Sequence, residues 1–318
     1  MTKNVSNKNG LVELFRFLCA VWVAYYHGFF PILSDKFDGV NISVDFFFMV
    51  TGIFFLKSIK KYEEGPFING VRHIFWDKIK EFVVPFIIAA SSILICNIIF
   101  ELDFGGYNWP LSFMWFFAAQ FVYLFVFYVL IRKIKRRYVF NIVCAIIMCI
   151  SMSLFIFMPE GFAKQFDRVF RGPAMLAIGI LISQIPKIKT KSKDKTKSEK
   201  LTLAINIVGF SIAAITFIYL AYLPEYTVLK LHIFLCLVCT SLLYFATSLT
   251  VHSKFLNLLG EISIFIYLAQ CPILIHYYAV NDTTENEFPL FCICIVALFA
   301  INRAVNLIKR KIKRKQIA

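Results

Sequence analysis

The sequence predicts an all-α, polytopic membrane protein with about ten transmembrane helices and both termini in the cytoplasm. Three observations support this prediction. The chain is 59% hydrophobic with a mean hydropathy of +0.73, whereas soluble domains are about 45–50% apolar. Apolar windows of about 20 residues, the length that crosses a bilayer, recur along the whole chain. Basic residues concentrate between alternate windows, as they do on the cytoplasmic side of membrane proteins.

Each apolar window is expected to form one helix, because a lipid-exposed backbone must satisfy its hydrogen bonds internally. These windows leave little chain outside the membrane, so we expect residues 1–318 to form one integral domain. A basic cytoplasmic loop at about 187–200 and a basic tail at 309–318 complete it. The predicted spans cover residues 11–30, 40–57, 81–100, 110–131, 138–158, 169–186, 201–223, 228–250, 257–278 and 288–308.

The net charge of +15 follows this topology. With the N-terminus inside, 27 of the 34 lysines and arginines fall in cytoplasmic segments, as the positive-inside rule requires. The charge therefore indicates a multi-pass protein of the cell membrane whose basic segments meet anionic lipid, and we expect no nucleic-acid partner. Cys236 and Cys239 have the spacing of a metal motif, but no further ligands stand at zinc-site spacing, so no metal is expected.

The first predicted span carries three polar residues that membrane insertion alone does not explain. Arg16 and His27 are eleven residues apart, which places them on one helix face about 16 Å apart along the axis. Glu13 lies one turn before Arg16, where an ion pair can form. Such a stripe is typical of a channel or tunnel lining. The structural alternatives are a salt bridge that lowers the insertion cost, a snorkelling arginine, and an interfacial histidine.

The second predicted span places Asp45 at its outer end, at a depth similar to that of His27. A carboxylate that binds one imidazole nitrogen fixes the tautomer and leaves the other nitrogen free as a base. Asp45 and His27 together therefore indicate acid–base chemistry. The alternative is that Asp45 caps its own helix.

Further candidates lie at the ends of other spans or within them. Arg171, at the outer start of the sixth span, either binds an anionic group or snorkels to the interface. Trp115 either packs in the aromatic belt or stacks on a sugar ring. Lys78 and Lys80, at the cytoplasmic mouth of the third span, suit phosphate groups, although topology alone also favours lysines there. Gln270 lies within the ninth span and needs a hydrogen-bond partner.

These residues together resemble the acyltransferase 3 family of integral membrane proteins. Its first helix carries an arginine and a histidine with ten residues between them, as Arg16 and His27 do. "SVDFFFMVTG" is similar to the G-V-D-x-F-F-x-x-S-G pattern of its second helix. "WFF" at 115–117, "RGPAMLAIGILI" and "LLGEISIFIYLAQCPIL" resemble later family segments. The likeness spans nearly the whole chain. Gln270 stands where the family usually has a histidine, and Glu81 and Phe82 stand where an arginine is common.

The resemblance implies transfer of an acyl group, usually acetyl from acetyl-CoA, to a hydroxyl of a cell-surface polysaccharide or a lipid-linked glycan. We expect His27, Asp45 and Arg16 to be catalytic. Partners would be acyl-CoA, an envelope glycan acceptor, membrane lipids and, in one arrangement, a separate extracytoplasmic transferase. The remaining candidates are expected to bind donor or substrate: Glu13, Lys78, Lys80, Trp115, Arg171 and Gln270. The alternative function is a transporter or flippase, although no pair of Gly/Pro-interrupted helices marks two repeat halves.

Overall fold

The structure is a computed structural model that describes residues 9–24, 40–76, 91, 109–157, 160–185, 197–222, 229–249, 251–280, 292–301, 303 and 304. Over these residues the fold is all-helical, without strands, which confirms the all-α part of the prediction. The termini, residues 1–8 and 305–318, lie outside the described ranges.

The described helices follow the predicted apolar windows closely, with two exceptions. They are α1 (Gly10–Ala24), α2 (Val40–Ile59), the short 3-10 helix η2 (Lys60–Tyr62), α4 (Trp109–Lys133), α5 (Arg137–Phe157), α6 (Glu160–Gln184), α7 (Lys197–Tyr222), α8 (Leu229–Ser248) and α9 (Lys254–Val280). Residues 67–76 and 292–301 are also helical. The exceptions are α6, which begins nine residues before the window predicted at 169–186, and residues 67–76, which lie between two predicted windows.

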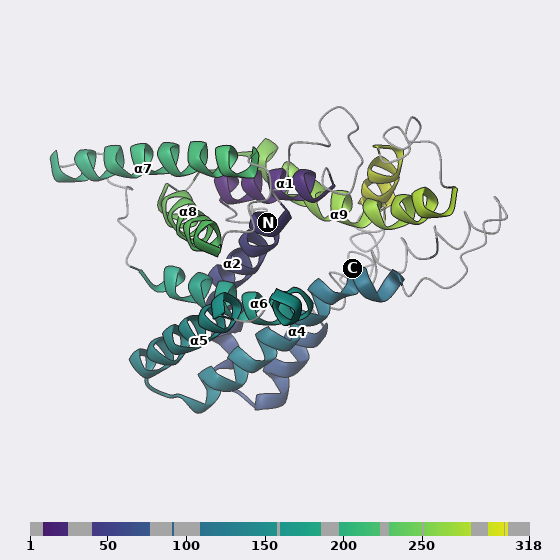
Figure 1. The fold of residues 1–318 in the computed structure, drawn as a ribbon. Coiled ribbons are helices and arrows are strands. Elements are labelled where there is room, and N and C mark those ends of the chain that lie inside the picture. Colours follow the sequence, from purple (N-terminus) through teal and green to yellow (C-terminus); the bar gives the residue numbers. More distant parts are fainter. Residues whose placement is uncertain are drawn as a thin grey trace, which may run out of the picture.

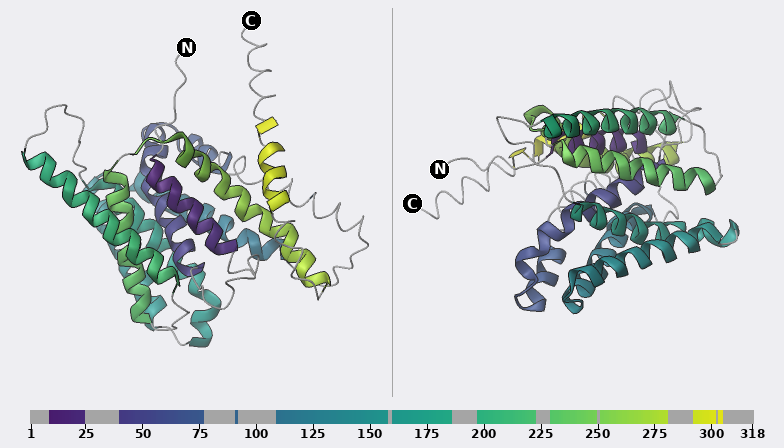
Figure 2. Two further views of the ribbon diagram at one scale, coloured as in Figure 1. Left: turned by 90° about the horizontal axis from the view of Figure 1, so that it is seen from above. Right: turned by 90° about the vertical axis from the view of Figure 1, so that its left-hand side faces the viewer.

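The helices form two groups joined by α2. In Figure 1, α1, α7, α8 and α9 lie in the upper half and α4, α5 and α6 in the lower half, and α2 runs between them. Figure 2 shows the same division from the side. Helix α2 packs against α6 in the lower group and against α1 and α8 in the upper group. A residue on α2 can therefore contact both halves of the molecule.

Contacts between the helices give their relative directions. Residues 10 and 13 of α1 meet residues 256 and 260 of α9 in the same order, so these two helices run parallel. Phe15 of α1 packs against Phe46 of α2 with ring centroids 6.2 Å apart. The start of α5 meets the end of α6, because Arg137 Nε donates to Gln184 Oε1 at 3.0 Å, so α5 and α6 are antiparallel.

Helices α2 and α6 approach closely because each has a glycine at their contact. A Cβ atom on Gly52 would collide with the backbone of Leu176, and one on Gly179 would collide with the backbone of Met49. Small residues allow this close approach between helices in membrane proteins. The glycines therefore set the helix separation at which side chains of α2 and α6 meet.

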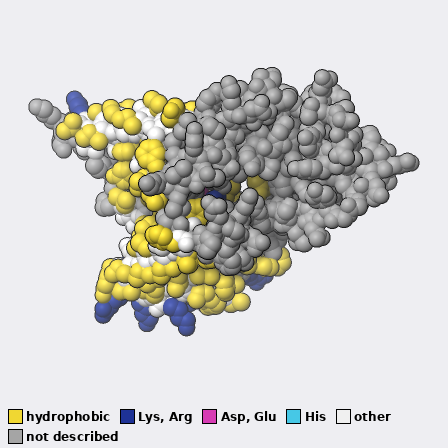
Figure 3. Space-filling view, in the orientation of Figure 1, with side chains coloured by type: hydrophobic (Ala, Val, Ile, Leu, Met, Phe, Trp, Pro, Cys, Tyr) yellow, Lys and Arg dark blue, Asp and Glu magenta, His cyan; other side chains and the backbone are white. Residues whose placement is uncertain are grey.

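The outer surface of the described part is strongly apolar. Ile142, Ile146 and Ile150 recur at every fourth position of α5, each at least half exposed, and α7 shows a similar row from Leu201 to Ile215. Figure 3 shows hydrophobic side chains over α7 and over the lower helices, with lysines and arginines along the lower edge. The segments Arg137–Phe155 and Lys200–Tyr219 are long and apolar enough to cross a membrane. Both fit a membrane protein, while the count of about ten spans stays a prediction.

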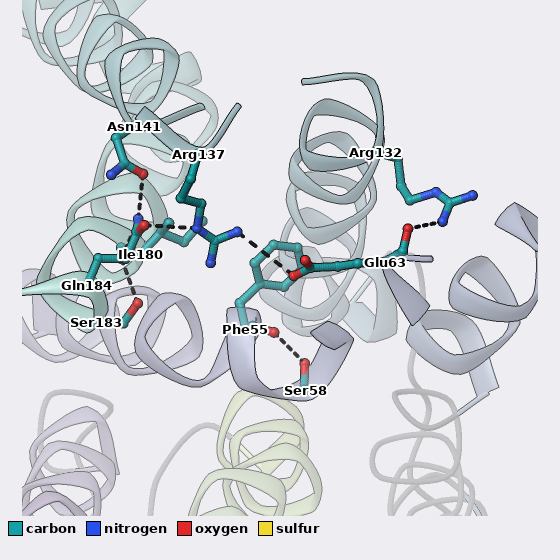
Figure 4. A network of polar contacts seen from close by, with 9 residues as sticks. All are labelled: Phe55, Ser58, Glu63, Arg132, Arg137, Asn141, Ile180, Ser183 and Gln184. Atoms are coloured by element: carbon teal, nitrogen blue, oxygen red, sulfur yellow. Dashed lines mark hydrogen bonds and ion pairs between the residues drawn. The ribbon is translucent and has the colours of Figure 1, made fainter. Parts of the chain in front are cut away.

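Polar contacts fasten the ends of α2, α4, α5 and α6 to one another (Figure 4). Arg132 of α4 donates to the backbone carbonyl of Glu63, just after α2. Arg137 of α5 lies 3.8 Å from the Glu63 carboxylate. Gln184 of α6 donates to Asn141 Oδ1 at 2.6 Å. All four helix ends are ones that the predicted topology assigns to the cytoplasmic side.

Candidate functional site

Two ion pairs dominate the interior of the described bundle, and the more deeply buried one joins α2 to α6. Arg171 Nε donates to Asp45 Oδ1 at 2.9 Å. The side chains of Arg171 and Asp45 are only 5% and 2% exposed. Both charges are withdrawn from water, which costs several kcal/mol per ion, so such a pair persists only with close and specific geometry. The glycine contacts of α2 and α6 bring the two side chains into reach.

Aromatic and sulfur-containing side chains surround this pair. The Arg171 guanidinium carbon lies 5.9 Å from the centre of the Phe155 ring, within cation–π range. A Cβ on Gly172 would meet Tyr123 and Phe48. Cys236 of α8 lies 3.8 Å, sulfur to sulfur, from Met175 of α6, one turn beyond Arg171. The pair thus sits where α2, α5, α6 and α8 converge.

This arrangement bears on three expectations. Helix α6 begins at Glu160, eleven residues before Arg171, so the helix is longer than the span predicted at 169–186. The snorkelling alternative is wrong, because Arg171 is only 4% exposed and binds Asp45. Asp45 does not cap α2, because that helix already begins at Val40. Five of the nine residues at 160–168 are charged or carry an amide, so an apolar window did not include the first turns of α6.

The second pair, Glu13 with Arg16, has the predicted spacing on α1. Arg16 Nη1 lies 3.2 Å from one carboxylate oxygen of Glu13 and 3.0 Å from the other. The side chain of Glu13 is 4% exposed, whereas that of Arg16 is 28% exposed. Glu13 fills the space left by Gly260 of α9, where a Cβ would collide with the carboxylate. The carboxylate is therefore enclosed, and the guanidinium stays partly accessible.

The other candidates fall outside the described residues or are described only in their backbone. His27, Lys78 and Lys80 lie outside the described ranges, so the pairing of His27 with Asp45 stays a prediction. Trp115 is in α4 and Gln270 is in α9, both as helical backbone whose side chains are not described.

A third polar contact, between Gln120 of α4 and Thr51 of α2, was missed from the sequence. Gln120 Nε2 donates to Thr51 Oγ1 at 2.5 Å, and Thr51 Oγ1 donates to the Phe47 carbonyl at 2.9 Å. Gln120 is 5% exposed. The reasoning applied to Gln270, that a glutamine inside a span needs a partner, would have found Gln120 as well.

No group of three or more His, Cys, Asp or Glu side chains in the described part of the chain is placed to hold a metal ion.

The acyltransferase 3 family model, described as an acyltransferase domain, matches residues 9–302. This is nearly the whole chain, so the protein belongs to that family, as the resemblance of its motifs predicted. Family membership supports acyltransferase activity. Comparison with curated proteins and with solved structures finds no match.

Proposed function

We propose that the protein is a multi-pass O-acyltransferase of the cell membrane. It transfers an acyl group, most simply acetyl, from acyl-CoA to a hydroxyl of a surface polysaccharide or a lipid-linked glycan. The observation that carries the proposal is the family match over residues 9–302, on a bundle whose interior holds charged pairs and whose exterior is apolar.

Helix directions support the multi-pass arrangement. In a chain that crosses a membrane at every predicted span, α1 and α9 enter from the same side and α2 runs opposite to α1. The parallel packing of α1 with α9 agrees with the first of these two expectations. The shared end of α2, α4, α5 and α6 carries Lys57, Arg132 and Arg137, which suits the cytoplasmic side.

The acyl donor is cytosolic and polyanionic, and Arg16 is the described cation best placed to serve it. Arg16 sits two turns into α1, near the end that the topology puts in the cytoplasm. Its guanidinium is partly exposed while Glu13 holds it on one side. In the proposed mechanism this group stabilises the donor, and Lys78 and Lys80 hold the donor phosphates at the cytoplasmic mouth.

The acceptor hydroxyl attacks the thioester carbonyl, and His27 takes the hydroxyl proton. The carbon–sulfur bond then breaks, and CoA leaves as a thiolate that collects a proton. A positioned base of this kind contributes typically about 10²–10⁴-fold. Asp45 is the carboxylate proposed to orient His27, and Arg171, which binds one oxygen of Asp45, fixes the position of that carboxylate. Trp115 and Gln270 are proposed to contact the acceptor.

Purified protein in lipid vesicles, given labelled acetyl-CoA and a panel of glycan acceptors, tests the proposal. Label that moves from acetyl-CoA to the acceptor, with release of free CoA, is the expected result. Movement of an acceptor across the vesicle membrane with no acyl transfer would instead identify a transporter or flippase. Transfer that requires an added extracytoplasmic protein would show that the acyl group passes to a separate transferase.

A further inference from the structure

The contact between Thr51 and Gln120 leaves one strong hydrogen-bonding atom unused. Gln120 is 5% exposed, and its Oε1 atom has no hydrogen-bond partner among the described residues. A buried polar atom without a partner costs about 1–3 kcal/mol, so native structures rarely keep one without a reason. A ligand that supplies a donor to this atom would remove that cost.

Thr51 fixes which end of the carboxamide faces away from it. The Thr51 hydroxyl hydrogen is committed to the Phe47 carbonyl, so Thr51 Oγ1 can only accept from the glutamine. The amide nitrogen of Gln120 must therefore face Thr51, and the carbonyl oxygen must face away. That oxygen accepts hydrogen bonds and cannot donate them. The missing partner is therefore an N–H or O–H group.

The depth of this atom indicates which substrate supplies the donor. Thr51 lies six residues beyond Asp45 and eight before the end of α2 at Ile59. At 1.5 Å per residue, it is about 9 Å from the level of Asp45 and about 12 Å from the cytoplasmic end. A glycan acceptor enters from the other side. The arm of acyl-CoA, which must reach from the cytoplasm toward Asp45, passes this depth.

We propose that Gln120 Oε1 accepts a hydrogen bond from an amide N–H of the pantetheine arm of acyl-CoA, with Thr51 holding the carboxamide in register. This inference rests on the proposed function. Gln120 acts as a donor-binding residue, and Thr51 acts as a positioning residue through it. The arm carries two amide N–H groups along its length and one hydroxyl close to its phosphate end. At the depth of Gln120 the amides are the nearer donors, and the acyl thioester itself has none.

The test compares equilibrium binding of CoA with that of 3′-phospho-ADP, which has the nucleotide but no arm. Gln120→Met keeps the shape and removes the acceptor, so it should weaken CoA binding about tenfold, the value of one hydrogen bond of about 1.4 kcal/mol. Binding of 3′-phospho-ADP should not change. Gln120→Glu should bind CoA nearly as the native protein does, because a buried carboxyl is protonated and keeps a carbonyl acceptor.

Thr51→Val is the control for a purely structural contact. If the pair only ties α2 to α4, Thr51→Val and Gln120→Met lower the thermal midpoint alike, and CoA affinity stays native in both; that result overturns the inference. Equal weakening of CoA and 3′-phospho-ADP also overturns it. If the native protein binds CoA and the variants bind it equally well, the inference fails and the proposed function still stands. Native protein that binds no CoA defeats the proposed function itself.

Discussion

The Glu13–Arg16 and Asp45–Arg171 pairs contain the same chemical groups at nearly the same distance, yet their surroundings differ. Arg171 and Asp45 are both almost fully buried. They lie 126 residues apart in sequence and join two helices, α2 and α6. Arg16 and Glu13 lie on one helix, and only the carboxylate is enclosed. The Arg171 guanidinium is almost fully buried against Asp45, whereas part of the Arg16 guanidinium is exposed and can be reached by a ligand. We therefore propose that Arg171 stabilises the helix bundle and positions Asp45, whereas Arg16 binds the acyl donor.

His27→Ala should give the largest change, because it removes the proposed base from the stripe that begins with Arg16. We expect turnover to fall about 10²–10⁴-fold, with the amount of folded protein nearly unchanged, since the residue stands at the outer end of its predicted span. Steady-state kinetics on purified variants measures this. Near-normal turnover in a well-folded His27→Ala protein would show that His27 is not the base.

Arg171→Met should be the most destabilising change within the pairs, because it leaves the Asp45 carboxylate buried without its guanidinium. Breaking a buried pair in this way costs about 3–5 kcal/mol. The double variant Asp45→Asn, Arg171→Met should recover most of that loss, since no charge is then buried. Detergent-unfolding curves give both values.

Arg303→Met is the matched control for this experiment. Arg303 and Glu261 form a pair of similar length, 2.8 Å, but their side chains are 48% and 43% exposed, and exposed pairs contribute about 0–1 kcal/mol. Equal losses for Arg171→Met and Arg303→Met would show that burial does not distinguish the pairs.

Gly179→Leu tests whether the helix approach sets the Asp45–Arg171 contact. The added side chain must push α2 from α6, so we expect a loss of about 1–3 kcal/mol in stability together with reduced turnover. Gly65→Leu is the control, because a Cβ at Gly65 meets nothing within 4 Å. A stable, fully active Gly179→Leu protein would argue that the close contact is unnecessary.

The smallest change in activity should come from replacing Arg16. Glu13 is replaced as well, so that its buried carboxylate is not left without a partner. Glu13→Gln alone keeps the cation and should leave the KM for acetyl-CoA near its native value. Adding Arg16→Gln removes the cation and should raise that KM about tenfold, equivalent to about 1.4 kcal/mol. A double variant with native KM but little folded protein would make this pair purely structural.

The sequence predicted the helices far better than the contacts between them. The windows at 138–158 and 201–223 fall within a few residues of α5 and α7, because a lipid-facing helix is apolar along its whole length. The start of α6 was missed because five of the nine residues at 160–168 are charged or carry an amide, although the helix continues through them. Glu13 and Arg16 were paired from their spacing alone.

The partner of Arg171 could not be predicted in this way. Asp45 lies 126 residues away, and only the packing of α2 against α6 brings the two together. Interhelical pairs depend on which helix faces meet, and that is decided by small residues such as Gly52 and Gly179, whose role shows only when both helices are in place. The partner of Gln120 could not be predicted for the same reason, since Thr51 is on another helix.

Equilibrium binding of CoA to three proteins most directly tests whether Arg16 binds the donor while Arg171 has a structural role. These are the native protein, the Glu13→Gln, Arg16→Gln variant and the Asp45→Asn, Arg171→Met variant, each checked for folding. We predict that CoA binds about tenfold more weakly to the Arg16 variant, while the Arg171 variant keeps native affinity and loses turnover. Native affinity in the Arg16 variant, with weakened binding in the Arg171 variant, would contradict the account.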